Sequence, residues 1–218
     1  MQFVLLDRST ARSAFSRLYA NYSDAEYYVK FKTPIQLLVA AILSAQTRDD
    51  VVNAVTPELF RKYDTAEDYA KASTDDLIKY VGRVSFALAK SKNIISACRI
   101  IVEKYDGKVP KTLDELLELP GIGRKTANTI LINAYGIVEG IPVDTWVIKL
   151  AHRIGLSDKE DPDGIEKDLE QLIDRRYWHN AAYALKAHGK KVCKSTLPEC
   201  SKCVLNSMCP KNDVEKRL

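Results

Sequence analysis

At 218 residues the chain is long enough to bury one sizeable core or two small ones. Its composition, 46% hydrophobic and 28% charged, is that of an ordinary globular protein. The net charge of +4 is compatible with a nucleic-acid partner but does not identify one. The N-terminus lacks the apolar run of a secretory signal, and the longest apolar stretch, residues 35–43, is too short to span a membrane. We therefore expect a soluble, intracellular protein with reduced cysteines.

Helical spacing dominates the first half of the chain. Apolar residues recur at helical intervals over residues 9–22 and predict an amphipathic helix. Residues 33–36, Thr-Pro-Ile-Gln, combine an N-cap, a proline at the first helical position and a glutamine three residues on. The helix that they begin is apolar nearly all round, which predicts a place in the middle of a core. Further N-cap signals at Thr47, Thr65 and Ser73 predict three more helices.

A longer helix is predicted over residues 86–105, with Cys98 on its apolar face as a core residue. Residues 112–136 then form a distinct unit. A capping box at 112–115 starts a short helix, residues 120–123 (Pro-Gly-Ile-Gly) form a tight turn, and a second helix runs from Arg124 to Tyr135 before Gly136. The first turn of this second helix begins Arg-Lys, where the helix dipole disfavours cations. Two cations at a helix start are the opposite of what stability alone favours, so their presence indicates that an anion binds there.

The last third of the chain is also helical. Asp144 is predicted to cap a helix that ends at Gly155, and Asp161, followed by proline, to cap another that reaches about Asp174. A further helix over residues 178–189 leads into the C-terminal cysteines. No stretch shows the sustained alternation of a strand. We predict an all-α fold of on the order of ten helices.

Four cysteines end the chain in the pattern C-x6-C-x2-C-x5-C: Cys193, Cys200, Cys203 and Cys209. Four thiols on a short, loop-rich segment indicate a metal centre. A structural zinc is one interpretation, but zinc ribbons usually present two C-x2-C pairs and this segment has one. The wide, uneven spacing favours an iron–sulfur cluster. Its predicted role is to fold this segment, because metal binding supplies folding free energy in so small a module.

These motifs together resemble the endonuclease III family of DNA base-excision glycosylases. The stretch LPGIGRKTAN at 119–128 resembles the family's helix–hairpin–helix, and VDT at 143–145 resembles its catalytic aspartate segment. LSAQTRD at 43–49 resembles its DNA-wedge motif, and the cysteine spacing is that of its [4Fe-4S] loop. The resemblance extends from about Ser13 to Cys209 with the motifs in order.

The resemblance implies a two-domain helix–hairpin–helix glycosylase fold with a DNA-binding cleft. Residues 28–137 are expected to form a six-helix barrel domain that includes the helix–hairpin–helix at about 112–136. Residues 1–27 and 138–218 are expected to form the iron–sulfur cluster domain. Lys125 and Asp144 would then come from opposite sides of the cleft.

Lys125 is the expected nucleophile. An amine beside helix N–H groups and another cation has its protonated form disfavoured, so its pKa is expected to fall. By resemblance, the amine attacks C1′ of a nucleotide, forms a Schiff base and cuts the strand by β-elimination; a simple phosphate contact is the alternative. Asp144 is an N-cap on its own residues. By resemblance it also helps to deprotonate the lysine or stabilises positive charge on the sugar.

The remaining candidates are DNA contacts. Gln46 matches the wedge that fills the gap left by a flipped base. Hairpin contacts are expected from Gly121, Ile122, Gly123, Arg124 and Thr126, and a contact near the cysteine loop from Lys191. The family often has histidine where this chain has Trp146. The segment after Gly82 looks about three residues longer than is usual, which leaves Arg83 and Val84 as alternatives for a second wedge. His152, His179 and His188 are interpreted as structural or phosphate-facing.

The expected function is that of a bifunctional DNA glycosylase and AP lyase that removes oxidised pyrimidines. It would act as a monomer on double-stranded DNA with a damaged base or an abasic site, and in the cytoplasm, associated with the nucleoid. A mismatch thymine or uracil glycosylase of the same superfamily is one alternative. A non-catalytic, DNA-binding iron–sulfur protein is another.

Overall fold

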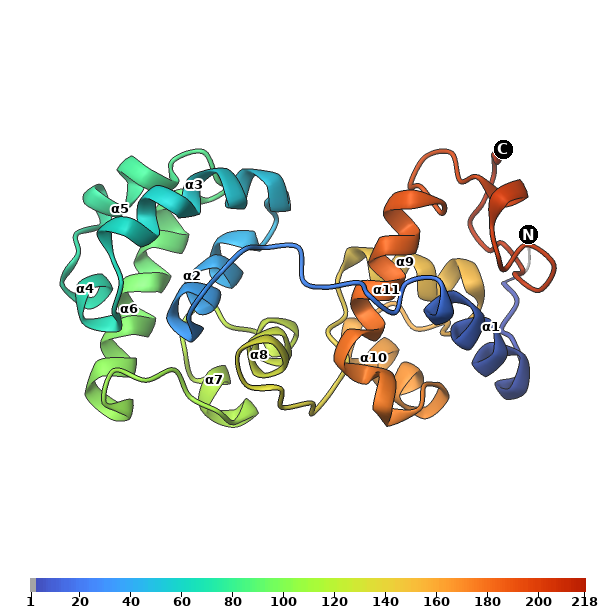
Figure 1. The fold of residues 1–218 in the computed structure, drawn as a ribbon, viewed down its shortest axis with the longest axis horizontal. Coiled ribbons are helices and arrows are strands. Elements are labelled where there is room, and N and C mark those ends of the chain that lie inside the picture. Colours follow the sequence, from blue (N-terminus) through green and yellow to red (C-terminus); the bar gives the residue numbers. More distant parts are fainter. Residues whose placement is uncertain (1–2) are drawn as a thin grey trace. The chain divides into compact units, whose positions relative to one another are not determined.

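The computed structural model describes residues 3–218, which form helices, turns and loops (Figure 1). The all-α prediction is confirmed. Contacts divide the chain into two compact units, Tyr27–Glu139 and Met1–Glu26 with Gly140–Leu218. The first of these, the continuous unit, is built of α2 (Pro34–Ser44), α3 (Asp49–Lys62), α4 (Ala66–Lys71), α5 (Thr74–Val81), α6 (Ala87–Tyr105), α7 (Leu113–Leu117), α8 (Arg124–Ile130) and a π-helical turn (Leu131–Tyr135).

The second, discontinuous unit joins the two ends of the chain. It is built of α1 (Arg8–Ala20), α9 (Thr145–Ile154), α10 (Pro162–Leu172), α11 (Trp178–Lys191) and the 3₁₀ turns Arg175–Tyr177 and Cys200–Lys202. The sequence-based boundaries, 28–137 and the remainder, lie within two residues of those of the two units. Within residues 3–218, no helix has both the length and the apolar character needed to cross a membrane.

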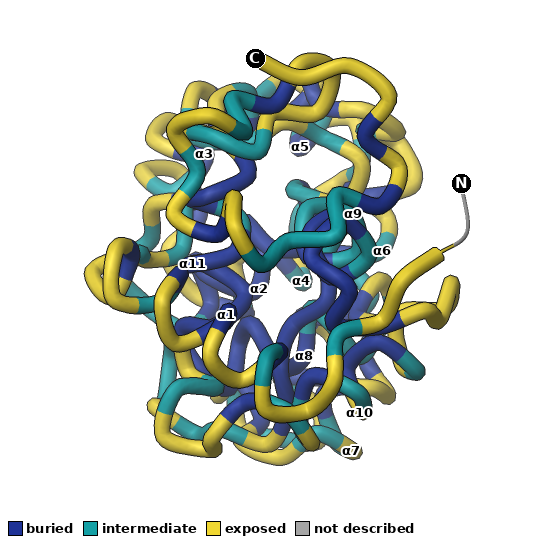
Figure 2. Tube along the Cα trace, turned by 90° about the vertical axis from the view of Figure 1, so that its right-hand side faces the viewer, coloured by how far each residue is buried: buried dark blue, intermediate teal, exposed yellow. Residues whose placement is uncertain are grey.

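Helix α2 is the centre of the continuous unit. Nine of its eleven residues are buried, and it contacts α3, α6 and α8 (Figure 2). Thr33 caps its first turn by accepting a hydrogen bond from the N–H of Gln36, and Pro34 occupies the first helical position. Each fully buried Leu or Ile side chain stabilises the folded state by about 1.5–3 kcal/mol because it leaves water. With most of its residues buried, α2 lies in the middle of the core, as the sequence predicted.

Helix α6 packs against α4 and α5 and carries a buried cysteine. Cys98 is completely buried. Burial raises the pKa of its thiol to about 12, so it stays protonated at neutral pH. The interpretation of Cys98 as a core residue is confirmed.

Two local predictions are wrong in detail. Thr47 does not cap α3; the helix begins at Asp49, and the N-cap residue Arg48 makes no side-chain capping bond. The hydroxyl of Thr47 instead accepts a hydrogen bond from the N–H of Ser85 at 3.2 Å, so it is engaged with another loop. The helix from Arg124 does not stay α-helical to Tyr135, because its last turn widens into the π-helical turn.

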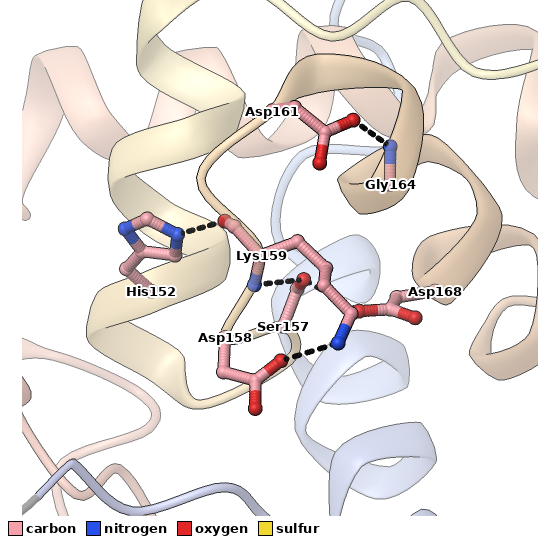
Figure 3. A network of polar contacts seen from close by, with 7 residues as sticks. All are labelled: His152, Ser157, Asp158, Lys159, Asp161, Gly164 and Asp168. Atoms are coloured by element: carbon pink, nitrogen blue, oxygen red, sulfur yellow. Dashed lines mark hydrogen bonds and ion pairs between the residues drawn. The ribbon is translucent and has the colours of Figure 1, made fainter.

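In the discontinuous unit, the loop between α9 and α10 is held by local polar contacts (Figure 3). Ser157 donates a hydrogen bond to Asp168 at 2.6 Å and accepts one from the N–H of Lys159 at 3.1 Å. Asp161 caps α10 by accepting from the N–H of Gly164 at 2.6 Å. These contacts confirm the predicted cap and fix where α10 begins.

The two ends of the chain meet through one side chain of this unit. Asn212 accepts a hydrogen bond from the N–H of Val4 at 3.1 Å and donates to the carbonyl of Val4 at 2.8 Å. The same amide donates to the carbonyl of His152 at 2.9 Å. Asn212, which is 6% exposed, therefore ties the N-terminal segment and α9 to the residues that follow the last cysteine.

Candidate functional site

The hairpin between α7 and α8 is shaped by glycine. Gly121 has a left-handed φ of 84°, and a Cβ there would lie 2.9 Å from Nδ2 of Asn93. Ile122 is 6% exposed and donates its N–H to the carbonyl of Leu119 at 3.1 Å. The hydrophobic side chain of the hairpin therefore anchors the turn to the core. The DNA contact expected of Ile122 stays a prediction.

The start of α8 is open. Gly123 occupies the N-cap position without a side-chain cap, and no atom lies within 4 Å of where its Cβ would stand. The first turn holds no acidic residue, while Arg124 and Lys125 are half-buried there, as is Thr126. The anion site that the sequence predicts at this helix start stays a prediction.

The segment after α2 presents Gln46. This residue is exposed and has a φ of 51°, in the left-handed region that side chains other than glycine rarely adopt. Such a conformation costs on the order of 1–3 kcal/mol and persists only where the surroundings impose it. Gln46 is therefore held in a fixed, outward-facing place.

The loop before α6 presents a second exposed side chain, which the sequence did not single out. Phe86 is 67% exposed and has a φ of 57°. Val84 is 4% exposed, so its side chain lies in the core here, and its alternative role as a second wedge stays a prediction. Arg83 is exposed. The signal in the sequence that could have pointed to Phe86 is its aromatic side chain, two positions after the proposed wedge residue Val84.

Asp144 caps α9, as predicted. Its Oδ1 accepts hydrogen bonds from the N–H groups of Trp146 at 2.9 Å and Val147 at 3.0 Å. Its Oδ2 lies 3.7 Å from Nζ of Lys186 on α11, and the two side chains are 25% and 13% exposed. One carboxylate oxygen thus serves the helix, while the other faces a cation. Lys186 is distant in sequence, and no local signal pointed to it.

Trp146 fills the space between α9 and α11. A Cβ on Gly189 would lie 2.4 Å from Cε3 of Trp146, so the indole packs directly against the glycine backbone. The ammonium of Lys149 lies 5.7 Å from the centre of the indole ring, within the range of a cation–π contact. The residue two positions after the catalytic candidate Asp144 is therefore a packing residue in this chain.

The four C-terminal cysteines line one pocket. They share it with mostly apolar side chains and with Arg153 and His188; the other lining residues are Ile154, Val192, Pro198, Glu199, Leu205, Asn206, Lys211 and Val214. Burial raises the pKa values of Cys193 and Cys203, and raises that of Cys209 to about 11. Within residues 3–218, no three His, Cys, Asp or Glu side chains stand close enough together to hold a single metal ion.

Arg153, which sequence reasoning missed, organises this pocket. It is 6% exposed and donates to the carbonyls of Lys194 and Ser195, each at 2.8 Å, and to that of Cys193 at 3.2 Å. A buried arginine in an apolar helix was the available signal. Because all three acceptors belong to the loop that begins at Cys193, Arg153 fixes the course of that loop.

The three histidines and Lys191 have local roles. His188 is 1% exposed and lies near Tyr22 and Cys203; burial lowers its pKa to about 4, so the ring is neutral. His152 and His179 contact the backbone carbonyls of nearby residues. The ammonium of Lys191 lies 5.4 Å from the centre of the Tyr22 ring on an exposed surface. The structural interpretation of His188 is confirmed.

Comparison with known proteins identifies the chain. The family described as HhH-GPD superfamily base excision DNA repair protein matches residues 39–175, well over half of the chain. The chain therefore belongs to this superfamily. Endonuclease III of Synechocystis sp. is 44% identical over 189 residues, 87% of this chain and 86% of that protein. Endonuclease III of Rickettsia felis is 40% identical over 179 residues, 82% of this chain and 84% of that protein.

A solved structure agrees with these relatives. The structure of a trapped endonuclease III–DNA covalent intermediate matches with a TM-score of 0.91 and 33% identity, covering 95% of this chain and 97% of that one. Within its superfamily the chain is thus a member of the endonuclease III family, and the resemblance stated from the motifs is confirmed.

Proposed function

We propose that this chain removes oxidised pyrimidines from duplex DNA and cleaves the resulting abasic site, with Lys125 as the nucleophile. Membership of its family makes it a base excision repair enzyme, a DNA glycosylase and AP lyase. The observation that carries the proposal is the start of α8. A lysine stands there in the first turn of a helix whose glycine N-cap position has no side-chain cap and whose first turn holds no acidic residue.

Lys125 is suited to attack a sugar. In its neutral form a lysine amine is a nucleophile that can attack C1′ of a sugar. The amine nitrogen bonds to C1′ as the bond to the base breaks, and the departing base takes the electron pair and a proton. Opening of the sugar leaves an imine between Lys125 and C1′. Loss of a proton from C2′ then expels the 3′ phosphate and cuts the strand.

Asp144 would supply the negative charge for this chemistry. With Oδ1 occupied by two backbone N–H groups, Oδ2 is the oxygen available to take a proton from Lys125 or to stabilise positive charge on the sugar. Lys186 places a positive charge beside this carboxylate, with its Nζ 3.7 Å from Oδ2.

DNA binding would use the hairpin and the two exposed loops. Backbone groups at Gly121 and Gly123 would meet phosphate, and Arg124 and Thr126 would flank them. Gln46 would fill the gap of the flipped base with its amide. Phe86, exposed and apolar, is suited to wedge the opposite strand. Lys191 adds a cation beside the cysteine loop.

The cysteine pocket fits an iron–sulfur cluster. Its four thiols, Cys193, Cys200, Cys203 and Cys209, are the donor set that such clusters require, and apolar side chains such as Ile154 and Leu205 line the pocket with them. A bound [4Fe-4S] cluster would supply folding free energy to the C-terminal segment. In this chain, Arg153 would place a positive charge beside the thiolates, with its Nη1 3.6 Å from Sγ of Cys193.

We expect the purified protein to contain about four iron atoms per chain and little zinc. Cys203→Ser should lower the iron content and the thermal stability together, because the ligands and the fold of the segment depend on one another. Cys98→Ser, at a cysteine buried in the continuous unit, is the control and should leave the iron content unchanged. Zinc at about one atom per chain in the wild type would overturn the assignment.

Substrate choice is tested with a panel of duplexes that contain thymine glycol, uracil opposite guanine, or thymine opposite guanine. We expect excision of thymine glycol followed by strand cleavage, and little action on the other two. Fast removal of mismatched thymine or uracil would instead support the mismatch-glycosylase alternative. Binding to abasic DNA without any cleavage would support the non-catalytic alternative.

A further inference from the structure

Lys90 is a buried lysine on α6. It is 5% exposed, and its ammonium donates to the carbonyl of Leu43 at 2.7 Å, to the carbonyl of Ala45 and to Oγ1 of Thr47 at 2.8 Å. An ammonium has three N–H donors, so each has an acceptor. All three acceptors are neutral. Burying a cation costs free energy. A lysine that is nevertheless buried against neutral partners is expected to have a role that an apolar side chain would not perform.

The partners of Lys90 mark the end of α2 and the segment that follows it. The carbonyls at a helix C-terminus carry partial negative charge, and α2 has no basic residue of its own in its last turn. Lys90 supplies that charge from another helix. Burial lowers the pKa of Lys90 to about 8, so the group is still mainly an ammonium at neutral pH.

Thr47 joins this contact to a second loop. Its hydroxyl accepts from Lys90 and from the N–H of Ser85 at 3.2 Å, and it donates to the carbonyl of Ala45 at 3.4 Å. The segment after α2 and the segment before α6 are thereby held to one another. The hydroxyl lies between them and uses its donor and both acceptor positions.

The two strained, exposed residues stand beside this network. Gln46 lies between Ala45 and Thr47, both of which bind Lys90. Phe86 follows Ser85, and its carbonyl accepts the backbone N–H of Lys90 at 3.0 Å. Both residues have a positive φ. The same lysine therefore contacts the carbonyl of Ala45 before Gln46 and the hydroxyl of Thr47 after it, and its backbone N–H binds the carbonyl of Phe86.

We propose that Lys90 is a positioning residue that locks the segments of Gln46 and Phe86 together, so that both side chains are set to enter DNA as one unit. This inference rests on the proposed function for its purpose, but the lock itself is a property of the free protein. Without the hydrogen bonds of Lys90, each segment alone would have to offset the free-energy cost of its left-handed residue. The two side chains would then become ordered only when DNA binds.

The lock is tested first without DNA. In Lys90→Met, which keeps the length of the side chain and removes its charge and donors, backbone amides of residues 44–48 and 83–86 should exchange with solvent at least about tenfold faster. Lys104→Met on the same helix is the matched control, because Lys104 is 60% exposed and pairs with Glu118 at the surface. Unchanged exchange in both segments of Lys90→Met would overturn the proposal.

The positioning role is tested with DNA. A duplex with 2-aminopurine opposite a stable abasic analogue reports by fluorescence when the opposite base is unstacked. Lys90→Met should bind this duplex at least about tenfold more weakly and give a smaller fluorescence rise. Borohydride trapping on a single-stranded abasic site, where no gap is filled, should not change. Equal losses on both substrates would indicate a merely structural lysine and would overturn the role.

Two further variants keep the test decisive. If Lys90→Met does not fold, Thr47→Val removes only the shared hydroxyl and should give the same pattern in a milder form. Adding Lys90→Met to Gln46→Ala should cause little further loss on the 2-aminopurine duplex, and additive losses would contradict action through Gln46. If the wild type is not trapped by borohydride, the proposed function is wrong. The amide exchange of Lys90→Met would still show whether Lys90 holds the two segments together.

Discussion

Lys125→Gln is expected to abolish covalent trapping by borohydride on a duplex with an abasic site, and to lower strand cleavage by at least about 10³-fold. The glutamine amide keeps most of the length of the lysine but has no nucleophilic amine, so no imine can form for borohydride to reduce. Trapped complexes are counted on a denaturing gel, and the modified peptide is identified by mass spectrometry. Binding of uncleaved duplex, measured by fluorescence anisotropy, should weaken far less than the chemistry.

Lys125→Arg separates the charge of the residue from its reactivity. The guanidinium stays protonated and can contact phosphate, but it does not form a Schiff base. We therefore expect Lys125→Arg to bind abasic duplex nearly as well as the wild type and to trap nothing. If either variant forms the covalent complex with DNA as the wild type does, Lys125 is only a phosphate contact. The amine that bonds to DNA must then be another one, to be identified by mass spectrometry of the digested complex.

Asp144→Asn is expected to lower glycosylase turnover by about 10²–10⁴-fold while leaving the melting temperature nearly unchanged. Asparagine is as good an N-cap as aspartate, so the bonds to the N–H groups of Trp146 and Val147 should persist. What the substitution removes is the negative charge at Oδ2. Calorimetry thus measures the capping role of Asp144, and single-turnover kinetics measure its role in catalysis.

The matched control is another aspartate cap of the same unit. Asp161 caps α10 as Asp144 caps α9. Asp161→Ala should lose about 1 kcal/mol of stability and leave the turnover of the folded enzyme unchanged. Normal turnover in Asp144→Asn would show that the residue is a cap and nothing more.

The sequence predicted the features that are local in the chain. Caps at Thr33, Asp144 and Asp161 follow from hydrogen bonds that span three residues, and α2 could be placed in the core because its apolar residues leave no polar face. The family motifs are also contiguous. Each of these signals is complete within a short window of the chain, so it does not depend on which distant segments the fold brings together.

The sequence could not predict contacts that form across the fold. Lys186 meets Asp144 from 42 positions away, and Thr47 was interpreted as a cap because nothing nearby shows that Ser85 and Lys90 use its hydroxyl. Val84 and Phe86 are both apolar, and only burial distinguishes the core residue from the exposed one. Lys90 did leave a trace, since it lies on the helix face of Ile94 and Cys98, where a charge is out of place.

The link that Asn212 makes between the two ends of the chain has a consequence for synthesis. The continuous unit is complete once Glu139 has left the ribosome, and it can fold while translation goes on. The segment at Val4 emerges before that unit but finds its partner only when Asn212, 208 positions later, has been made. The unit that holds Asp144 and the four cysteines is therefore finished after the continuous unit, and the nascent chain carries the segment at Val4 undocked until then.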